Sequence, residues 1–142
     1  MFINSKLMET NYLLEKSLDV ESVRKRVIAN NIANVDVPHF KRSEVNFESE
    51  LRRAIEQSRE SEGTFQGTLA DSRHIPFHQS RSVRDVKPRV NLDYNTTYRN
   101  DGNNVDIEKE MVDSSKNLMR YNALVTSLNQ NYKMIKLAMR PV

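Results

Sequence analysis

Cysteine is absent from this 142-residue sequence, which excludes disulfides, thiolate metal sites and cysteine nucleophiles. Glycine is scarce, with three residues in all, and no glycine-rich phosphate loop or G-x-S-x-G nucleophile elbow is present. The longest uninterrupted apolar runs are three residues, far below the about 18 that a membrane span requires. No basic start followed by an apolar stretch marks a secretory signal, so we expect any export to proceed without a cleaved signal peptide.

Apolar residues are also few. They make up 37% of the chain, whereas globular domains carry about 45–50% with glycine included. The net charge is only +3, and asparagine is abundant, with 15 residues. A chain of this size and composition is expected to bury a marginal core alone, which favours an obligate assembly protein.

The first segment, residues 1–35, is predicted to be an amphipathic helix. It holds no glycine or proline, and its apolar residues recur at helical spacing. Asp36 and Pro38 are expected to end the helix. The residues of the predicted apolar stripe are Leu13, Val20, Val23 and Val27.

The last segment, residues 105–142, carries the strongest pattern, a heptad repeat over four heptads. Asp106 is a suitable N-cap, and the acids that follow it favour a helix start there. One row of seven-residue spacing is Met111, Leu118, Val125, Tyr132 and Met139, and Ile107 precedes it. The second row is Ser114, Tyr121, Leu128 and Ile135, in which only the serine is polar.

The middle segment, residues 36–104, is predicted to be loop-rich or partly disordered. A short helix is expected over Ser43–Ser58, where Phe47, Leu51 and Ile55 are four residues apart, and a short strand is a candidate over Arg89–Tyr94. The predicted fold is therefore mostly α, with the long terminal helices forming an antiparallel coiled-coil-like hairpin around this middle segment. Neighbouring subunits are expected to cover the remaining apolar surface head to tail.

Two alternative sites were weighed in the middle segment. His74 and His78 have metal-ligand spacing, but Pro76 lies between them and no third ligand cluster exists, so no metal site is predicted. Residues 73–89 carry five basic side chains and one acid, which would suit a nucleic-acid phosphate backbone. Phe77 is the one nearby aromatic residue, so a solvated or protein-contacting loop is favoured over a nucleic-acid-binding module.

The run from Ala29 to Lys41, ANNIANVDVPHFK, resembles the ANNIANxxTPGYK signature of the flagellar rod and hook axial protein family. Val37 stands where the signature has threonine, and His39 where it has glycine, a position at which a positive φ would be harder for histidine. The resemblance assigns a helix-ending turn to Asn30, Asn31, Ala33, Asn34, Pro38 and Phe40.

A second segment, DGNNVDIEKEM from Asp101 to Met111, is similar to the DGNNVDxxxEM segment of the proximal rod members of this family, and KNLMRYNAL follows it. Ser72-Arg73-His74-Ile75 is similar to their PRHI segment, with serine replacing proline. The sister rod protein FlgC, which is expected to end differently, remains the alternative within the family.

The resemblance implies a non-enzymatic structural subunit, without cofactor, substrate or nucleic acid. It implies export by the flagellar type III apparatus and assembly in the periplasmic rod of the basal body, where packed helices transmit torque. The implied partners are further copies of the chain, the rod proteins FlgC, FlgF and FlgG, the adaptor FliE and the MS-ring protein FliF.

Overall fold

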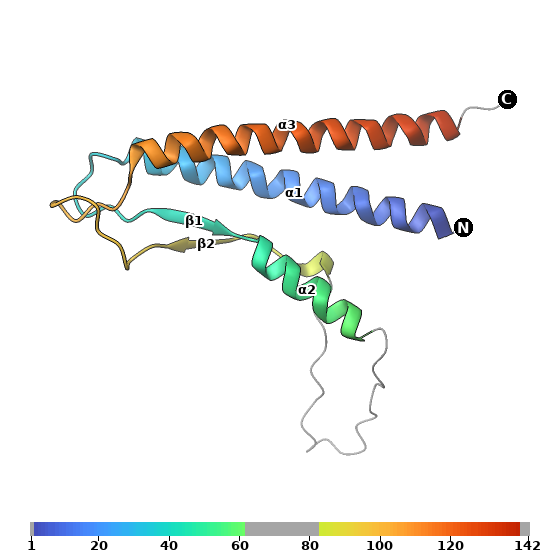
Figure 1. Cartoon of the computed structure of the whole chain (residues 1–142), viewed down its shortest axis with the longest axis horizontal. Helices are drawn as coiled ribbons and strands as arrows, with labels where there is room; N and C mark the ends of the chain where they lie inside the picture. Colours follow the sequence, from blue (N-terminus) through green and yellow to red (C-terminus); the bar gives the residue numbers. More distant parts are fainter. Residues whose placement is uncertain (1, 62–82, 140–142) are drawn as a thin grey trace, which may run out of the picture. The chain divides into compact units, whose positions relative to one another are not determined.

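Two long helices dominate the computed structural model, which describes residues 2–61 and 83–139. Helix α1 (Phe2–Ala33) and helix α3 (Ile107–Ala138) pack against each other and run antiparallel (Figure 1). Between them, the described residues form strand β1 (Ser43–Asn46), helix α2 (Glu48–Ser61), a 3₁₀ turn η1 (Val83–Asp85) and strand β2 (Arg89–Leu92). The predicted fold, long terminal helices around a loop-rich middle, is confirmed.

The chain divides into two compact units. The first, the hairpin unit, consists of Met1–Val45 and Val90–Val142, and the second consists of Asn46–Arg89. His74 and His78, for which no metal site is predicted, lie outside the described residues, as does most of the basic segment. Among the described residues, no helix combines the length and the apolar character that crossing a membrane requires.

Strands β1 and β2 form a two-stranded sheet with opposite directions (Figure 1). The short helix expected from Ser43 therefore begins later, at Glu48, because the backbone before it has partners elsewhere in the chain. The side-chain amide of Asn31 donates to the carbonyl oxygen of Ser43 at 2.9 Å and accepts from its N–H at 3.0 Å. Next to it, the N–H of Asp93 donates to the carbonyl oxygen of Arg42 at 2.9 Å.

Helix α3 starts as its sequence predicts. The carboxylate of Asp106 accepts hydrogen bonds from the N–H groups of Glu108 at 3.0 Å and Lys109 at 3.3 Å, which satisfies two donors of the first turn. The two acids of that turn, Glu108 and Glu110, lie at the positive end of the helix dipole.

The second unit has a small apolar centre of its own. Ala54 of α2 is buried there together with Phe47, which immediately precedes α2, and Val86, which follows η1. Helix α2 begins with the N–H of Leu51 donating to the carbonyl oxygen of Phe47 at 2.9 Å.

The hairpin unit buries more polar than apolar side chains. Its buried apolar residues are Val20, Ile28 and Val105. Its buried polar residues are Asn11, Glu21, Asn31, Arg42, Asn103, Asn104, Glu110 and Asn117. No buried side-chain nitrogen or oxygen of the described residues lacks a hydrogen-bond partner, so this polar interior is fully satisfied.

Candidate assembly surface and the polar interior of the hairpin

The family turn motif closes the hairpin at the end of α1. The N–H of Asn34 donates to the carbonyl oxygens of Asn30 and Asn31 at 3.2 Å each, and its side-chain amide donates to Asn30 again at 2.7 Å. Ala33 is the last residue of α1, and Pro38 lies exposed four residues after Asn34. Side-chain amides thus satisfy the helix end where proline prevents its continuation.

The side chain of Asn103 is bound to this turn and is 0% exposed. Its Nδ2 group faces three carbonyl oxygens of the turn, those of Asn34 at 3.1 Å, Val35 at 2.9 Å and Val37 at 2.9 Å. Its Oδ1 accepts from the N–H of Val105 at 2.7 Å. One buried amide therefore ties the turn after α1 to the segment that leads into α3.

Asn104 makes the neighbouring connection between the strands and that segment. Its Oδ1 accepts from the N–H of Arg42 at 2.6 Å, and its Nδ2 donates to the carbonyl oxygen of Asp93 at 2.8 Å and to Thr96 Oγ1 at 3.1 Å. The side-chain amides of Asn103 and Asn104 thus provide hydrogen-bond partners for backbone groups of irregular segments, which have no regular ladder to satisfy them.

His39, which stands where the family signature has glycine, adopts the left-handed conformation, with φ at 61°. Its N–H donates to the carbonyl oxygen of Asp101 at 3.1 Å. Gly102, with φ at 80°, lies against the imidazole, and a Cβ built on it would be 2.9 Å from His39 Nδ1. The turn accepts histidine because the facing residue has no side chain.

A buried ionic cluster lies beside the turn, between α1, β1 and α3. Glu110, at 0% exposure, accepts from Arg42 Nε at 2.5 Å and from Asn31 Nδ2 at 3.1 Å. Arg42 also pairs with Glu44 and lies 3.7 Å from Asp113. Burial opposes the charge of Arg42, but the hydrogen bonds to Glu110 and Glu44 outweigh it and raise the pKa of the guanidinium above its usual value.

Two further polar pairs join α1 to α3 along the hairpin. Asn117 Nδ2 donates to Glu21 Oε2 at 2.5 Å and to the Glu21 carbonyl oxygen at 3.0 Å. Nearer the open end, Asn131 Nδ2 donates to Asn11 Oδ1 at 2.8 Å. The hydroxyl of Tyr132 adds an exposed bond to Glu15 at 2.6 Å.

These contacts define which face of α3 lies against α1. We call the residues Glu110, Asn117, Leu124 and Asn131 the inner row; the first two are buried and the others half-buried. The outer row, Met111, Leu118, Val125, Tyr132 and Met139, starts one residue later, and all but the half-buried Val125 are exposed. The second predicted row lies at intermediate positions, with Leu128 and Ile135 half-buried and Tyr121 exposed.

The structure therefore separates the residues that the heptad pattern grouped together. On α1, Val20 is buried, and Leu13, Val23 and Val27 are half-buried. On α3, the exposed fractions of Met111 and Leu118 are both 57%, and Ile107 is also exposed. The outer row thus leaves an apolar stripe of α3 exposed in the single chain on both sides of the half-buried Val125, and this stripe is the candidate assembly surface.

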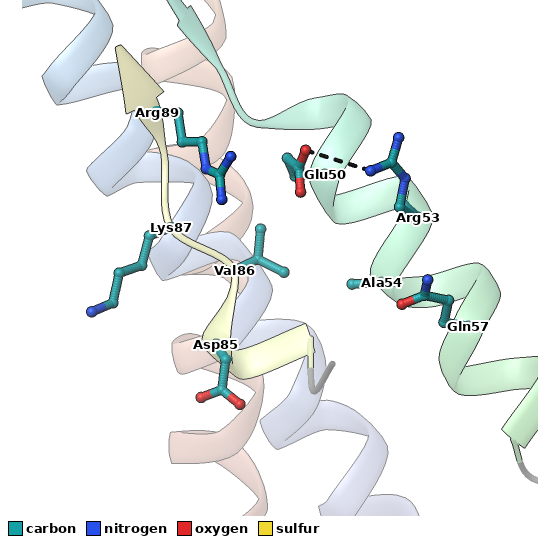
Figure 2. Close-up of a pocket in the computed structure, with 8 residues that line it drawn as sticks. All are labelled: Glu50, Arg53, Ala54, Gln57, Asp85, Val86, Lys87 and Arg89. Atoms are coloured by element: carbon teal, nitrogen blue, oxygen red, sulfur yellow. Dashed lines mark ion pairs between the residues drawn. The ribbon is translucent and has the colours of Figure 1, made fainter. Parts of the chain in front are cut away.

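An open hollow lies in the second unit, between α2 and the segment after η1 (Figure 2). Its lining is mixed in charge, with Glu50 and Arg53 paired at 3.8 Å on α2 and Asp85, Lys87 and Arg89 on the opposite segment. Among the described residues, no group of three or more acidic or histidine side chains is placed to hold a metal ion. The described residues that line the hollow include no serine, threonine or histidine.

Sequence reasoning missed most of the polar interior, namely Asn11, Glu21, Arg42, Asn103, Asn104, Glu110, Asn117 and Asn131. One signal was present, because Glu110, Asn117, Leu124 and Asn131 share the seven-residue spacing of the apolar rows. A search for hydrophobic periodicity does not detect that row, because three of its four members are polar.

Comparison with known proteins addresses the family. No protein-family model matches the sequence. The chain is 40% identical to the flagellar basal body rod protein FlgB of Borrelia hermsii over 128 residues, which cover 90% of this chain and 93% of that protein. It is 40% identical to the FlgB protein of Borreliella burgdorferi over 115 residues, covering 81% and 83% of the two chains.

A relative of lower identity gives the same result. The FlgB protein of Bacillus subtilis is 34% identical over 123 residues, which cover 87% of each chain. The Asp101–Met111 segment, on which the resemblance to one branch of the rod family rests, supplies the Asn103-Asn104 pair and Glu110. The chain therefore belongs to the FlgB family of flagellar basal body rod proteins.

Proposed function

We propose that this chain is a structural subunit of the proximal rod that carries torque through packed helices. Family membership supports the rod over the two alternatives, a FlgC-type protein and a nucleic-acid-binding module. The observation that carries the packing mechanism is the exposed outer row of α3, because a single chain leaves this apolar stripe in water.

The energetics favour burial of this stripe by neighbours. Covering a side chain such as Leu118 or Met111, which are more than half exposed, contributes about 1–2 kcal/mol each at the usual scale for aliphatic burial. A stripe that meets a different surface of the next subunit forms a heterologous contact, which propagates into a helical tube. Stiff helices that do not slip are sufficient for torque, so no catalytic group is required.

The proposed partners follow from the family. They are further copies of this chain, the rod proteins FlgC, FlgF and FlgG, the adaptor FliE, the MS-ring protein FliF and the export apparatus. The proposed location is the periplasmic rod of the basal body, reached without a cleaved signal peptide. We propose no cofactor and no enzymatic activity.

The test is a charged substitution in the outer row. Leu118→Glu places a carboxylate where a neighbour would bury leucine, and the residue is exposed in the single chain, so folding is preserved. We expect basal bodies without rods, and loss of swimming, when this variant replaces the native copy. Gln130→Glu is the matched control, because it adds the same charge to an exposed site of α3 two residues before the outer-row Tyr132.

Helicity of the purified Leu118→Glu chain, measured by circular dichroism, separates an assembly defect from a folding defect. Complete rods carrying Leu118→Glu would contradict the proposed assembly surface. Rods lost equally with Gln130→Glu would show that added charge on α3, and not the outer row, is responsible.

A further inference from the structure

Besides the exposed Tyr132–Glu15 bond, three polar contacts made by the inner row cross the hairpin at successive levels. Glu110 meets Asn31 near the closed end, Asn117 meets Glu21 in the middle, and Asn131 meets Asn11 toward the open end. Five of these six residues are buried, and Asn131 is half-buried. The inner row would be less costly to bury if it were leucine throughout, so its polar members require an explanation other than stability.

A slip of one heptad is the nearest competing arrangement, because it keeps the inner row against α1. In one direction it moves Glu110 to the level of Glu21, where two carboxylates would share a buried site. In the other direction it moves Leu124 to that level, where Glu21 loses the donor that Asn117 supplies. Glu21 keeps only its bond to Arg24 on its own helix, at 2.6 Å.

The open end opposes the same slips. One shift places Leu124 and the other Ala138 at the level of Asn11, so its side-chain oxygen loses the amide of Asn131. An apolar row of equivalent residues would gain nearly the same contacts after each shift of seven, whereas this order of side chains pairs fully in one register.

We propose that the three polar contacts set the axial register of α1 against α3. Their members are specificity-determining residues of the hairpin: Asn11, Glu21, Asn31, Glu110, Asn117 and Asn131. A fixed register also fixes the position of the outer row along the axis of the hairpin. A slip of one heptad would shift that row by about 10 Å. That last consequence rests on the proposed function, but the register itself is a property of the isolated chain.

The experiment measures the register directly in the purified full chain. Because the chain has no cysteine, Ser22→Cys and Ser127→Cys create the only two attachment points for spin labels, one exposed site on each helix. With the polar contacts intact, we expect a single distance in pulsed electron paramagnetic resonance. The test variant converts the middle and open-end contacts to leucine, with Asn11→Leu, Glu21→Leu, Asn117→Leu and Asn131→Leu.

We expect the leucine variant to keep its helicity and to show additional distances, displaced along the helix axis by about 10 Å. The control exchanges one pair, Glu21→Asn with Asn117→Glu, which keeps a donor opposite an acceptor and should retain the single distance. One unchanged distance in the leucine variant would overturn the proposal.

A companion variant covers the case in which four substitutions prevent folding. Glu21→Leu with Asn117→Leu removes the middle contact alone, and we expect a smaller displaced population from it. If only this variant folds, a single native distance in it overturns the proposal. Neither result depends on rods, so failure here is distinguishable from failure of the assembly test at Leu118.

Discussion

Replacing Glu110 by glutamine tests the energetics of the polar interior. Glu110 is fully buried and accepts from Arg42 and Asn31, while Arg42 is itself 8% exposed. Glutamine has nearly the same shape, so the substitution removes the negative charge without opening a cavity. It leaves the guanidinium of Arg42 buried beside Glu44 and Asp113, of which Asp113 is 3.7 Å away.

The expected magnitude follows from that geometry. Removing one partner of a buried ion pair costs about 3–5 kcal/mol, because the remaining charge stays out of water. Glu44 still balances part of the positive charge of Arg42. The expected loss of stability is therefore near the lower end of that range, about 3 kcal/mol. A single domain is stable by only about 5–15 kcal/mol, so this loss is a large fraction of the total.

Urea unfolding followed by circular dichroism is the appropriate assay. With a typical urea dependence of about 1–3 kcal/mol per molar, the midpoint should fall by about 1–3 M and the slope should stay unchanged. The double variant Arg42→Met with Glu110→Leu removes both charges, and it should recover most of the lost stability. A loss below about 0.5 kcal/mol in Glu110→Gln, or a double variant as unstable as the sum of its parts, would refute the reasoning.

Three further predictions concern the turn and the open end. Gly102→Ala should lower the free energy of unfolding by about 1–2 kcal/mol, because the φ of Gly102 is positive and the new Cβ would meet His39. Thermal unfolding measures this loss, and adding His39→Gly to the same chain should recover part of it. Asn103→Ala should cost about 1–3 kcal/mol, because three turn carbonyls lose a buried donor, and amide hydrogen exchange at the turn should accelerate. The hydrogen bond to Glu15 raises the pKa of Tyr132 above its ordinary value of 10.0. The contribution of this hydrogen bond to folding stability is therefore present below pH 10.0 and is lost as the pH rises through the raised pKa. Tyr132→Phe should flatten that alkaline loss in unfolding midpoints, and an unchanged pH dependence would contradict this assignment.

The helices were predictable because their signals are local. Asp106 followed by acids marks the start of α3, and the heptad spacing marks its length. The strand over Ser43–Asn46 was not predictable in the same way, since Asn31 and Asp93, which pair with the backbone at its start, lie far from it in the sequence. A short segment without a strong period takes the conformation that its partners impose.

The face of α3 that α1 covers was also beyond sequence reasoning. Hydrophobic periodicity favours the outer row, which is apolar at every position, over the inner row with Glu110, Asn117 and Asn131. The choice is decided by donors and acceptors on α1 and by Arg42, because a buried polar group is stable only where its partner is in reach. Such pairing becomes visible only when both helices are placed.

The hydrogen bonds at the closed end of the hairpin have a consequence for the order in which the chain folds. Several of them join residues 61 to 69 positions apart, as between Lys41 and Gly102 or between Asn34 and Asn103. During synthesis, which proceeds from the N-terminus, α1 cannot pack against α3 until residue 103 and the helix after it have emerged. This long loop must close before α1 and α3 can form stabilising contacts. The entropic cost of loop closure, and not helix formation, should therefore limit the rate at which the hairpin forms from its closed end toward its termini.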